Sequence, residues 1–519
     1  MDDRRHHRRS AYLLSLCGVG CLCIALSPGR ITSLDAGERL VIANQLWTSG
    51  TVFVDDATAM LFSEHGYTSY TGIGQSLVFI PFDMLGHALA WVLGLEGLDA
   101  DRVATLPVVF LYTLGVALAW FWAAVRLSEE LGTSQETALL AAWVLVLASP
   151  VGHYAFQTVQ EEAVVGALVA ACTVGALGWL RTRGNRYAAF SGAAAGAAVL
   201  FRLNVLFALI VPLAVVIEGI RCRPTPFATV RKGCVAALVG LAAPAGLWLL
   251  FNFWRYGNLF AAGHQLLLER EGRQLFHGPS LSVAAALLVG PGKGLLVTAP
   301  VLLFATLGLL QRRGGWRWSR ATLGLTLCGS LIFHSALYRG AADGSISWGC
   351  RYQVHLLSLF VFPLALGLNA VRRLRYGGVL LAVAFLAGLG VNGLGVMAPD
   401  SLEYFQIQAA KGAYSDEPLM GVTEGQIASR ASNVVRWLRS DFSPASADNE
   451  LGKAIRRMER AYMPNIWGPV YAKRLGDTRA ATLVAAVWGL VLVTGIMLWL
   501  AACRMAFKRM RKAAEPPAP

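Results

Sequence analysis

Residues 376–397 read YGGVLLAVAFLAGLGVNGLGVM and contain no charged side chain. A helix of about 20 apolar residues is long enough to cross the hydrocarbon core of a bilayer. Arg372, Arg373 and Arg375 come directly before this stretch, and clusters of basic residues tend to stay on the cytoplasmic side of a membrane. The stretch therefore predicts a transmembrane helix that begins in the cytoplasm.

The same pattern recurs along the whole chain of 519 residues, of which 55% are hydrophobic and only 15% charged. The mean hydropathy is +0.52, whereas a soluble chain of this length needs a far more charged surface. This composition excludes a soluble enzyme, a disordered chain and a repeat solenoid. The net charge of +14 sits in short basic clusters between apolar runs, which indicates membrane topology rather than nucleic-acid binding.

The basic clusters predict the topology. They occur within residues 4–9, 181–186, 221–232, 312–320, 372–375 and 504–512, and all are expected in the cytoplasm. An even number of spans must then separate consecutive clusters. The pattern predicts an all-α polytopic membrane protein with about 12 (11–13) transmembrane helices, at 11–29, 103–125, 136–152, 161–180, two within 187–219, and at 232–253, 293–311, 320–338, 352–371, 376–397 and 480–503.

One apolar run, 72–95, is left out of this count. Five runs precede residue 181, and an even number requires that one of them does not span. The run 72–95 contains Pro81, Asp83 and His87, and a polar run broken by proline is typical of a re-entrant or interfacial helix. We therefore expect residues 96–101 to lie outside the cell.

The expected organisation follows from these spans. Residues 1–10 form a cytoplasmic basic tail, and residues 11–397 form a multi-span core that includes a large outer loop, 28–74. Residues 398–479 form an extracytoplasmic segment, 480–503 the last span and 504–519 a cytoplasmic tail. The first apolar run could also be a signal peptide, but Pro28 directly after it argues against cleavage and favours a retained anchor.

Two acidic residues in the first outer loop are candidates for chemistry. Asp35 and Glu38 are three residues apart, so they share one face if this segment is helical. A carboxylate at the membrane surface can act as a general base toward a hydroxyl group. A structural role is equally consistent with the spacing, with Asp35 capping a helix that begins near Ala36 and Glu38 in its first turn.

Three basic residues stand at predicted outer ends of spans. They are Lys293 in Gly290-Pro-Gly-Lys-Gly294, Arg351 in Ser347-Trp-Gly-Cys-Arg-Tyr352 and Arg202 at a hairpin turn. A charge at such a depth is costly and should face a polar cavity or a partner, and an anion such as a lipid phosphate would satisfy all three. The alternatives are snorkelling for Lys293 and Arg351, and an ion pair with Glu161 or Glu162 for Arg202.

Known motifs for other chemistries are absent. The Gly-rich segment at 290–294 lacks the Walker spacing, and the sequence contains no HExxH and no GxSxG motif. The histidines are scattered, and most are expected to be structural. His264 is the one histidine that we single out as a candidate for binding an acceptor or a metal.

An ordered set of short motifs resembles a known family. They are Tyr70-Thr-Gly-Ile-Gly-Gln-Ser-Leu-Val-Phe-Ile-Pro81, Val159-Gln-Glu-Glu162, Leu200-Phe-Arg-Leu-Asn204, Tyr256-Gly-Asn-Leu-Phe-Ala-Ala-Gly263, Pro291-Gly-Lys-Gly-Leu295, Trp348-Gly-Cys-Arg-Tyr352 and Met463-Pro-Asn-Ile-Trp467. With the acidic loop after the first span, this order resembles the bacterial polyprenyl-phosphate-dependent glycosyltransferases of the C-type membrane fold. That group includes relatives of protein mannosyltransferases, of the aminoarabinose transferase of lipid A and of rhizobial lipopolysaccharide galacturonosyltransferases.

The resemblance implies specific roles. Asp35 matches the acidic residue of the first outer loop, which serves as the base or orients the acceptor. Glu162 matches an acid that helps to bind the acceptor or a metal, and Lys293 and Arg351 match residues near the donor phosphate. The sequence departs from the family where Asp35 and Glu38 are separated by two residues, and where Ala163 and Leu203 stand at positions at which proline is common. These departures leave the acceptor and the need for a divalent metal open.

The expected function is therefore an inverting transfer of a sugar from a polyprenyl-phosphate donor to an extracytoplasmic acceptor, which is a lipid-linked glycan, lipopolysaccharide, cell-wall glycan or protein. Asp35 is the expected base, with Lys293, Arg351 and Arg202 at the donor phosphate. The expected location is the bacterial inner membrane, with the active site on its outer face. The alternatives are a secondary transporter, which would usually show internal repeats, and a non-catalytic protein of envelope glycan assembly.

Overall fold

The computed structural model describes residues 2–54, 61–63, 66–68, 72–261, 263–270, 272, 274, 276–311, 315–337, 347–399, 402, 403, 405, 406, 409, 425–440, 450–475 and 478–514. Tyr70, Ala262, Arg312 and Arg313, which belong to patterns used above, lie outside these residues. Nearly all described elements are helices, and one short antiparallel hairpin pairs β1 (Leu61–Ser63) with β2 (Gly66–Thr68).

The first half of the chain contains α1 (Asp2–Leu26), α2 (Leu34–Ser49), α3 (Gly74–Val92), α4 (Gly97–Pro107), the π-helical turn η1 (Val108–Tyr112), α5 (Thr113–Glu130), α6 (Gln135–Leu147), α7 (Pro150–Phe156), α8 (Glu161–Thr182), α9 (Asn185–Phe201), η2 (Leu203–Val205), α10 (Leu206–Cys222) and α11 (Phe227–Tyr256).

The second half contains α12 (Gly263–Arg270), α13 (Leu281–Val289), α14 (Leu295–Thr298), α15 (Leu302–Leu310), α16 (Arg317–Ser335), η3 (Arg351–Gln353), α18 (Val354–Leu357), η4 (Ser358–Phe360), α19 (Val361–Val371), α20 (Gly377–Met397), α23 (Gln426–Leu438), α24 (Glu450–Tyr462), α25 (Trp467–Arg474) and α26 (Thr478–Ala514).

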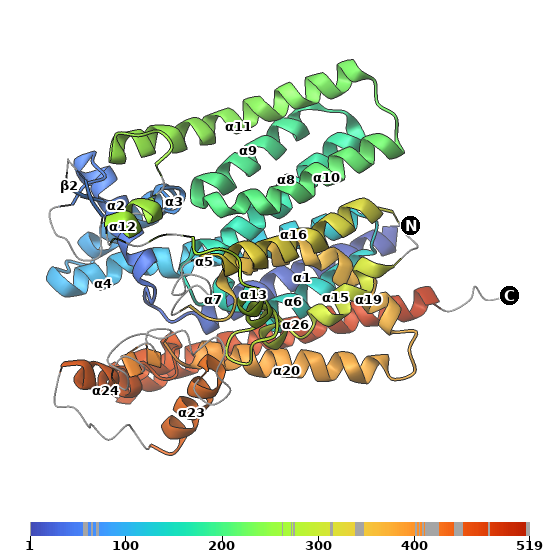
Figure 1. Ribbon diagram of the computed structural model, residues 1–519. Coiled ribbons are helices and arrows are strands. Elements are labelled where there is room, and N and C mark those ends of the chain that lie inside the picture. Colours follow the sequence, from blue (N-terminus) through green and yellow to red (C-terminus); the bar gives the residue numbers. More distant parts are fainter. Residues whose placement is uncertain are drawn as a thin grey trace.

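The long helices run roughly side by side and give the molecule two distinct ends (Figure 1). Both termini lie at one end, whereas α2, α3, α12 and α24 lie at the other. Ion pairs join helices at the end that holds the termini, between Arg181 and Glu130 at 2.9 Å and between Arg509 and Glu136 at 3.4 Å. Arg181 and Arg509, which belong to two of the predicted cytoplasmic clusters, therefore lie at the end of the bundle that holds the termini.

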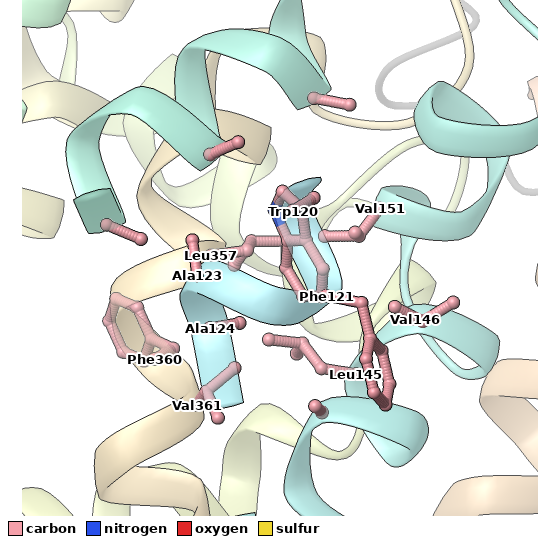
Figure 2. Close-up of a cluster of buried hydrophobic side chains, with 14 of the residues drawn as sticks. Trp120, Phe121, Ala123, Ala124, Leu145, Val146, Val151, Leu357, Phe360 and Val361 are labelled. Carbon is pink, nitrogen blue, oxygen red and sulfur yellow. The ribbon is translucent and has the colours of Figure 1, made fainter. Parts of the chain in front are cut away.

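The apolar core between these ends is built from helices that are far apart in the sequence. Trp120 and Phe121 of α5 pack against Leu145 of α6, and Phe360 and Val361 approach from the other side (Figure 2). Small residues such as Ala123 and Ala124 let the helix backbones come close.

Eight helices in the described part of the chain are long and apolar enough to cross a membrane, or nine if a bent pair counts as one span. The protein is thus an all-α, multi-pass membrane protein, as the sequence predicts. The predicted number of 12 spans stays a prediction, because several predicted spans consist of shorter helices.

Prolines explain where two predicted spans are broken. The run 136–152 forms α6 and α7, which meet at an angle of 80°, because Ser149 caps α7 and Pro150 occupies its first turn. The run 293–311 forms α14 and α15, with Pro300 between them. A proline lacks the backbone N–H that a continuous helix requires.

The run 72–95 differs from expectation in one respect. Here α3 is one continuous helix through Pro81, so the expectation of a broken helix was wrong. Its polar residue Asp83 is buried, whereas Leu85, Trp91 and Val92 are exposed. An outward apolar face fits contact with lipid, and the placement of α3 at the membrane surface stays a prediction.

The described helices within 398–479 carry their own apolar cluster. Leu402, Ile455 and Met463 are buried against one another, and Trp437 and Met458 pack on them. Arg430 is completely buried and pairs with Glu403 at 2.7 Å. This cluster lies at the end of the bundle away from the termini (Figure 1).

Candidate active site

A network of charged side chains lies where α2, α8, the α9–α10 turn and η3 meet. Its centre is Glu162, whose side chain is completely buried. Glu162 Oε1 accepts hydrogen bonds from Arg351 Nε and from Arg202 Nη1. Arg351 Nη2 in turn donates to Asp35 Oδ2 at 2.8 Å. The structure therefore brings together four of the residues that the sequence suggests.

Asp35 is the most accessible carboxylate of this network. Its side chain is 22% exposed, against 5% for Glu161 and 0% for Glu162. It lies in the first turn of α2, which begins at Leu34 rather than near Ala36. The partial positive charge of a helix N-terminus favours a carboxylate there. Asp35 thus lies at a helix N-terminus and is partly exposed.

Arg202 forms the internal ion pairs that were the alternative to anion binding. Its Nη1 lies 3.3 Å from Glu161 Oε1 and also contacts Glu162. Its guanidinium stacks on the Tyr352 ring at 4.6 Å, and His334 stacks on the same ring with the centroids 4.8 Å apart. The position of Arg202 is therefore fixed by two ion pairs and by the stacking of its guanidinium on Tyr352.

Glu161 carries a second part of the network that the sequence analysis missed. Its Oε2 pairs with Arg39, and Arg39 Nη1 donates to Gln75 Oε1 at 2.8 Å. Gln75 Nε2 then donates to the carbonyl of Val159 at 2.9 Å. Arg39 follows Asp35 by four residues, the spacing of one helix face, and this spacing could have indicated it.

Two glycines of the Tyr70–Pro81 motif let α3 begin close to the network. A Cβ atom on Gly72 would lie 2.1 Å from Phe201 O, and one on Gly74 would lie 2.9 Å from Phe201 N. Such distances are too short for any other residue. The start of α3 is thereby fixed against the end of α9, next to Arg202.

Lys293 lies beside the loop that carries Arg351. The Cys350 Sγ lies 3.2 Å from the Lys293 carbonyl oxygen and 3.0 Å from the Leu287 carbonyl oxygen, and its single S–H proton is shared between these two acceptors. The Lys293 side chain is completely buried, whereas a snorkelling lysine keeps its ammonium group in water. Snorkelling therefore does not describe Lys293.

Helix α23, in the segment that is predicted to be extracytoplasmic, holds the Arg351 loop in place. Gly349 N donates to Gln426 Oε1 at 3.2 Å, and Gln426 Nε2 donates to the Ser347 carbonyl at the same distance. Arg430 stacks on Trp348 at 4.4 Å. The Trp348 carbonyl accepts from Tyr154 at 2.8 Å. Side chains from two separate helices, α23 and α7, thus hold residues 347–349 in place.

The remaining candidates are placed differently. Glu38 is buried one turn after Asp35. His264 lies on α12, and its side chain is outside the part of the molecule that the structure describes.

The carboxylates of this network do not fit a divalent cation, because each of Asp35, Glu161 and Glu162 faces a guanidinium. Among the described residues, no three His, Cys, Asp or Glu side chains group as metal ligands.

No protein-family model and no curated protein matches this chain. Among solved structures, it is similar to ArnT from Cupriavidus metallidurans in the apo state, with 14% identity, a TM-score of 0.46, and coverage of 95% of this chain and 76% of that one. The same protein bound to undecaprenyl phosphate gives 14% identity, a TM-score of 0.45, and coverage of 96% and 77%.

Arabinosyltransferase EmbB from Mycobacterium smegmatis is also similar, with 13% identity, a TM-score of 0.43, and coverage of 89% of this chain and 43% of that one. All three TM-scores are below 0.5, so the C-type membrane glycosyltransferase fold named from the sequence stays a prediction. The likeness is loose, so the functional proposal rests on this chain's own residues.

Proposed function

We propose that this protein is a membrane glycosyltransferase that moves a sugar from a polyprenyl-phosphate donor to an acceptor outside the cytoplasm. The observation that carries the proposal is the contact between Asp35 and Arg351. Asp35 is the most accessible carboxylate of the network, and Arg351 is a cation that can bind a phosphate. The motifs that carry the family resemblance supply these same residues.

The reaction would proceed with inversion at the sugar. The acceptor hydroxyl oxygen attacks the anomeric carbon, the bond from that carbon to the phosphate oxygen breaks, and polyprenyl phosphate leaves with the bonding electrons. Asp35 takes the hydroxyl proton. Negative charge develops on the phosphate, and Arg351 and Lys293 stabilise it in a site with little water.

From the sequence, Arg202 was expected to contact the donor phosphate, but here we propose an indirect role. Its guanidinium already faces Glu161 and Glu162, so it holds the Glu162 side chain in place. Glu162 then orients Arg351 through its Nε. Arg202 thus acts on the donor phosphate through Glu162 and Arg351.

Donor binding and base activation would be linked through Arg351. One guanidinium nitrogen, Nη2, faces Asp35, and a phosphate entering the site competes for it. Charge-assisted hydrogen bonds to phosphate are strong. Once Nη2 turns to the phosphate, Asp35 Oδ2 loses this donor and is available to accept the proton of the acceptor.

The experiment is a comparison of surface glycolipids and glycoproteins by mass spectrometry in a deletion strain. We expect one sugar to be missing, to return with the wild-type gene, and to stay missing with Asp35→Asn at equal protein abundance. An unchanged glycan profile in the deletion strain would contradict a transferase. A restored profile with Asp35→Asn would contradict Asp35 as the base and favour a role in assembly without catalysis.

A further inference from the structure

Two arginines from distant parts of the chain meet on one tyrosine. Arg30 lies in the connection after α1, and its guanidinium carbon is 3.5 Å from the centre of the Tyr462 ring. Arg474, the last residue of α25, lies 5.0 Å from the centre of the same ring. Two like charges near one ring repel each other, and an anion close to both would offset this repulsion.

Within the described residues, neither arginine forms an ion pair with a carboxylate. Arg30 Nη2 donates to Asn465 Oδ1 at 3.2 Å, and its Nε is buried without a hydrogen-bond partner in the described structure. Burial lowers the pKa of Arg30 to about 10; Tyr462 opposes this change and the charge of Arg474 adds to it. The Arg30 side chain as a whole is partly exposed, and an anion beside it would offset the cost of its one buried N–H group without a partner.

The position of this pair corresponds to the outer surface of the membrane. Arg30 follows the end of α1 at Leu26, and Arg474 precedes the start of α26 at Thr478. Trp467 Nε1 donates to the Ile24 carbonyl at 2.7 Å, and Tyr471 OH donates to the Gly29 carbonyl at 2.9 Å. Tryptophan and tyrosine are typical of the headgroup level, where lipid phosphates lie.

We propose that Arg30 and Arg474 bind a phosphate group at the outer membrane surface, in a site separate from the network around Glu162. The accessible N–H groups of the partly exposed Arg30 and of the exposed Arg474 are its donors. Arginine pairs with phosphate through such N–H groups. The phosphate of a lipid headgroup and free phosphate share this chemistry. The site does not depend on the proposed transferase activity.

Other stacked arginines provide a matched control. Arg186 lies over Tyr187 at 5.0 Å and Arg375 over Tyr376 at 5.2 Å. Each is a single arginine on the tyrosine next to it in the sequence, at the opposite end of the bundle. These pairs test whether any exposed arginine–tyrosine contact attracts a phosphate.

The experiment is hydrogen exchange on the purified full chain in detergent, read in peptides from residues 450–474. The probes are phosphatidic acid, diacylglycerol and inorganic phosphate. We expect phosphatidic acid to slow exchange in these peptides and diacylglycerol to leave it unchanged. The double variant Arg30→Gln with Arg474→Gln should bind at least about tenfold more weakly, and Arg186→Gln with Arg375→Gln should bind as wild type does.

Each other outcome has a meaning. Protection by inorganic phosphate as well supports the same site with free phosphate as a ligand. Equal protection by diacylglycerol, or unchanged affinity in the double variant, would overturn the proposal. Arg474 is exposed, so the single variant Arg474→Gln should fold normally and still bind several-fold more weakly; wild-type affinity in that variant would also overturn it.

Discussion

Asp35 Oδ2 and Arg351 Nη2 lie 2.8 Å apart although 316 residues separate them in the chain. The same arginine also contacts Glu162 through Nε. A proposed base and a proposed phosphate ligand are therefore partners of each other in this structure. In the proposed reaction, the donor phosphate and Asp35 therefore compete for the guanidinium of Arg351.

The first prediction concerns Asp35. Asp35→Asn keeps the size of the side chain and much of its ability to cap a helix, but it cannot take up a proton. We expect transfer to fall by roughly 10²–10⁴-fold, with the protein still folded, because Arg351 keeps Glu162 as a partner. The measurement is the rate of sugar transfer by equal amounts of inserted protein.

Glu38→Gln is the control for Asp35, since Glu38 lies one turn further along α2. Near-normal transfer by Glu38→Gln supports Asp35 as the base. Inactivity of Glu38→Gln together with an active Asp35→Asn would move this role to Glu38. Activity in both variants would remove the start of α2 from the chemistry.

The second prediction concerns the cations at the donor phosphate. Lys293→Met and Arg351→Met each remove a charge from a buried position. We expect kcat to fall by roughly 10²–10³-fold, as when one transition-state donor is lost, at unchanged protein abundance. Arg351→Lys should recover little of the lost activity. The guanidinium is a planar fork that reaches Asp35 and Glu162 at once, whereas the ammonium of lysine is a compact point charge. Normal turnover at limiting donor in both Met variants would show that neither residue serves the phosphate.

The sequence predicts the broad fold well because long apolar runs and basic clusters are local signals. The helices Gly377–Met397 and Phe227–Tyr256 closely match the spans predicted from their residues. The sequence shows Pro150 and Pro300, but it does not show whether either proline interrupts its helix. Whether a proline bends or interrupts an apolar run depends on what packs beside it.

The site was predicted as a set of residues but not as a network. Asp35, Glu162, Arg202 and Arg351 were each named, and the ion pair of Arg202 with Glu161 or Glu162 was predicted as an alternative. The contacts of Arg351 with Asp35 and Glu162 were not predicted, because ion pairs between distant segments follow from tertiary packing. Gln157 illustrates this limit. Its Nε2 lies within 3.1 Å of the carbonyls of Leu26, Val396 and Asn465, and no local pattern indicates that one glutamine would join three segments.

The third prediction concerns the stability of the segment that holds the Arg351 loop. Arg430 is completely buried, pairs with Glu403 at 2.7 Å and donates to the Gly395 carbonyl at 2.6 Å. Arg430→Met leaves Glu403 as a buried charge without this partner, which should lower the free energy of unfolding by about 3–5 kcal/mol. Thermal unfolding of the purified protein in detergent measures this change.

An exposed ion pair is the control for Arg430. Arg126 pairs with Glu129 at 2.9 Å, but the Arg126 side chain is 45% exposed. Arg126→Met should therefore lower the free energy of unfolding by only about 0–1 kcal/mol. Equal losses in the two variants would mean that the buried pair adds nothing beyond a surface contact.

The fourth prediction concerns the placement of α3. If α3 lies at the outer surface and does not cross the bilayer, the start of α4 is outside the cell. Asp99 is 69% exposed there and contacts only the exposed Arg102 among its described ion pairs, so Asp99→Cys should not disturb the fold. We expect this cysteine to react with an impermeant maleimide in intact cells, above the labelling of the wild-type chain. Arg186→Cys, at the end of the bundle that holds the termini, should react only after lysis. Protection of Asp99→Cys in intact cells, with labelling after lysis, would mean that α3 spans the membrane and would place the start of α4 in the cytoplasm.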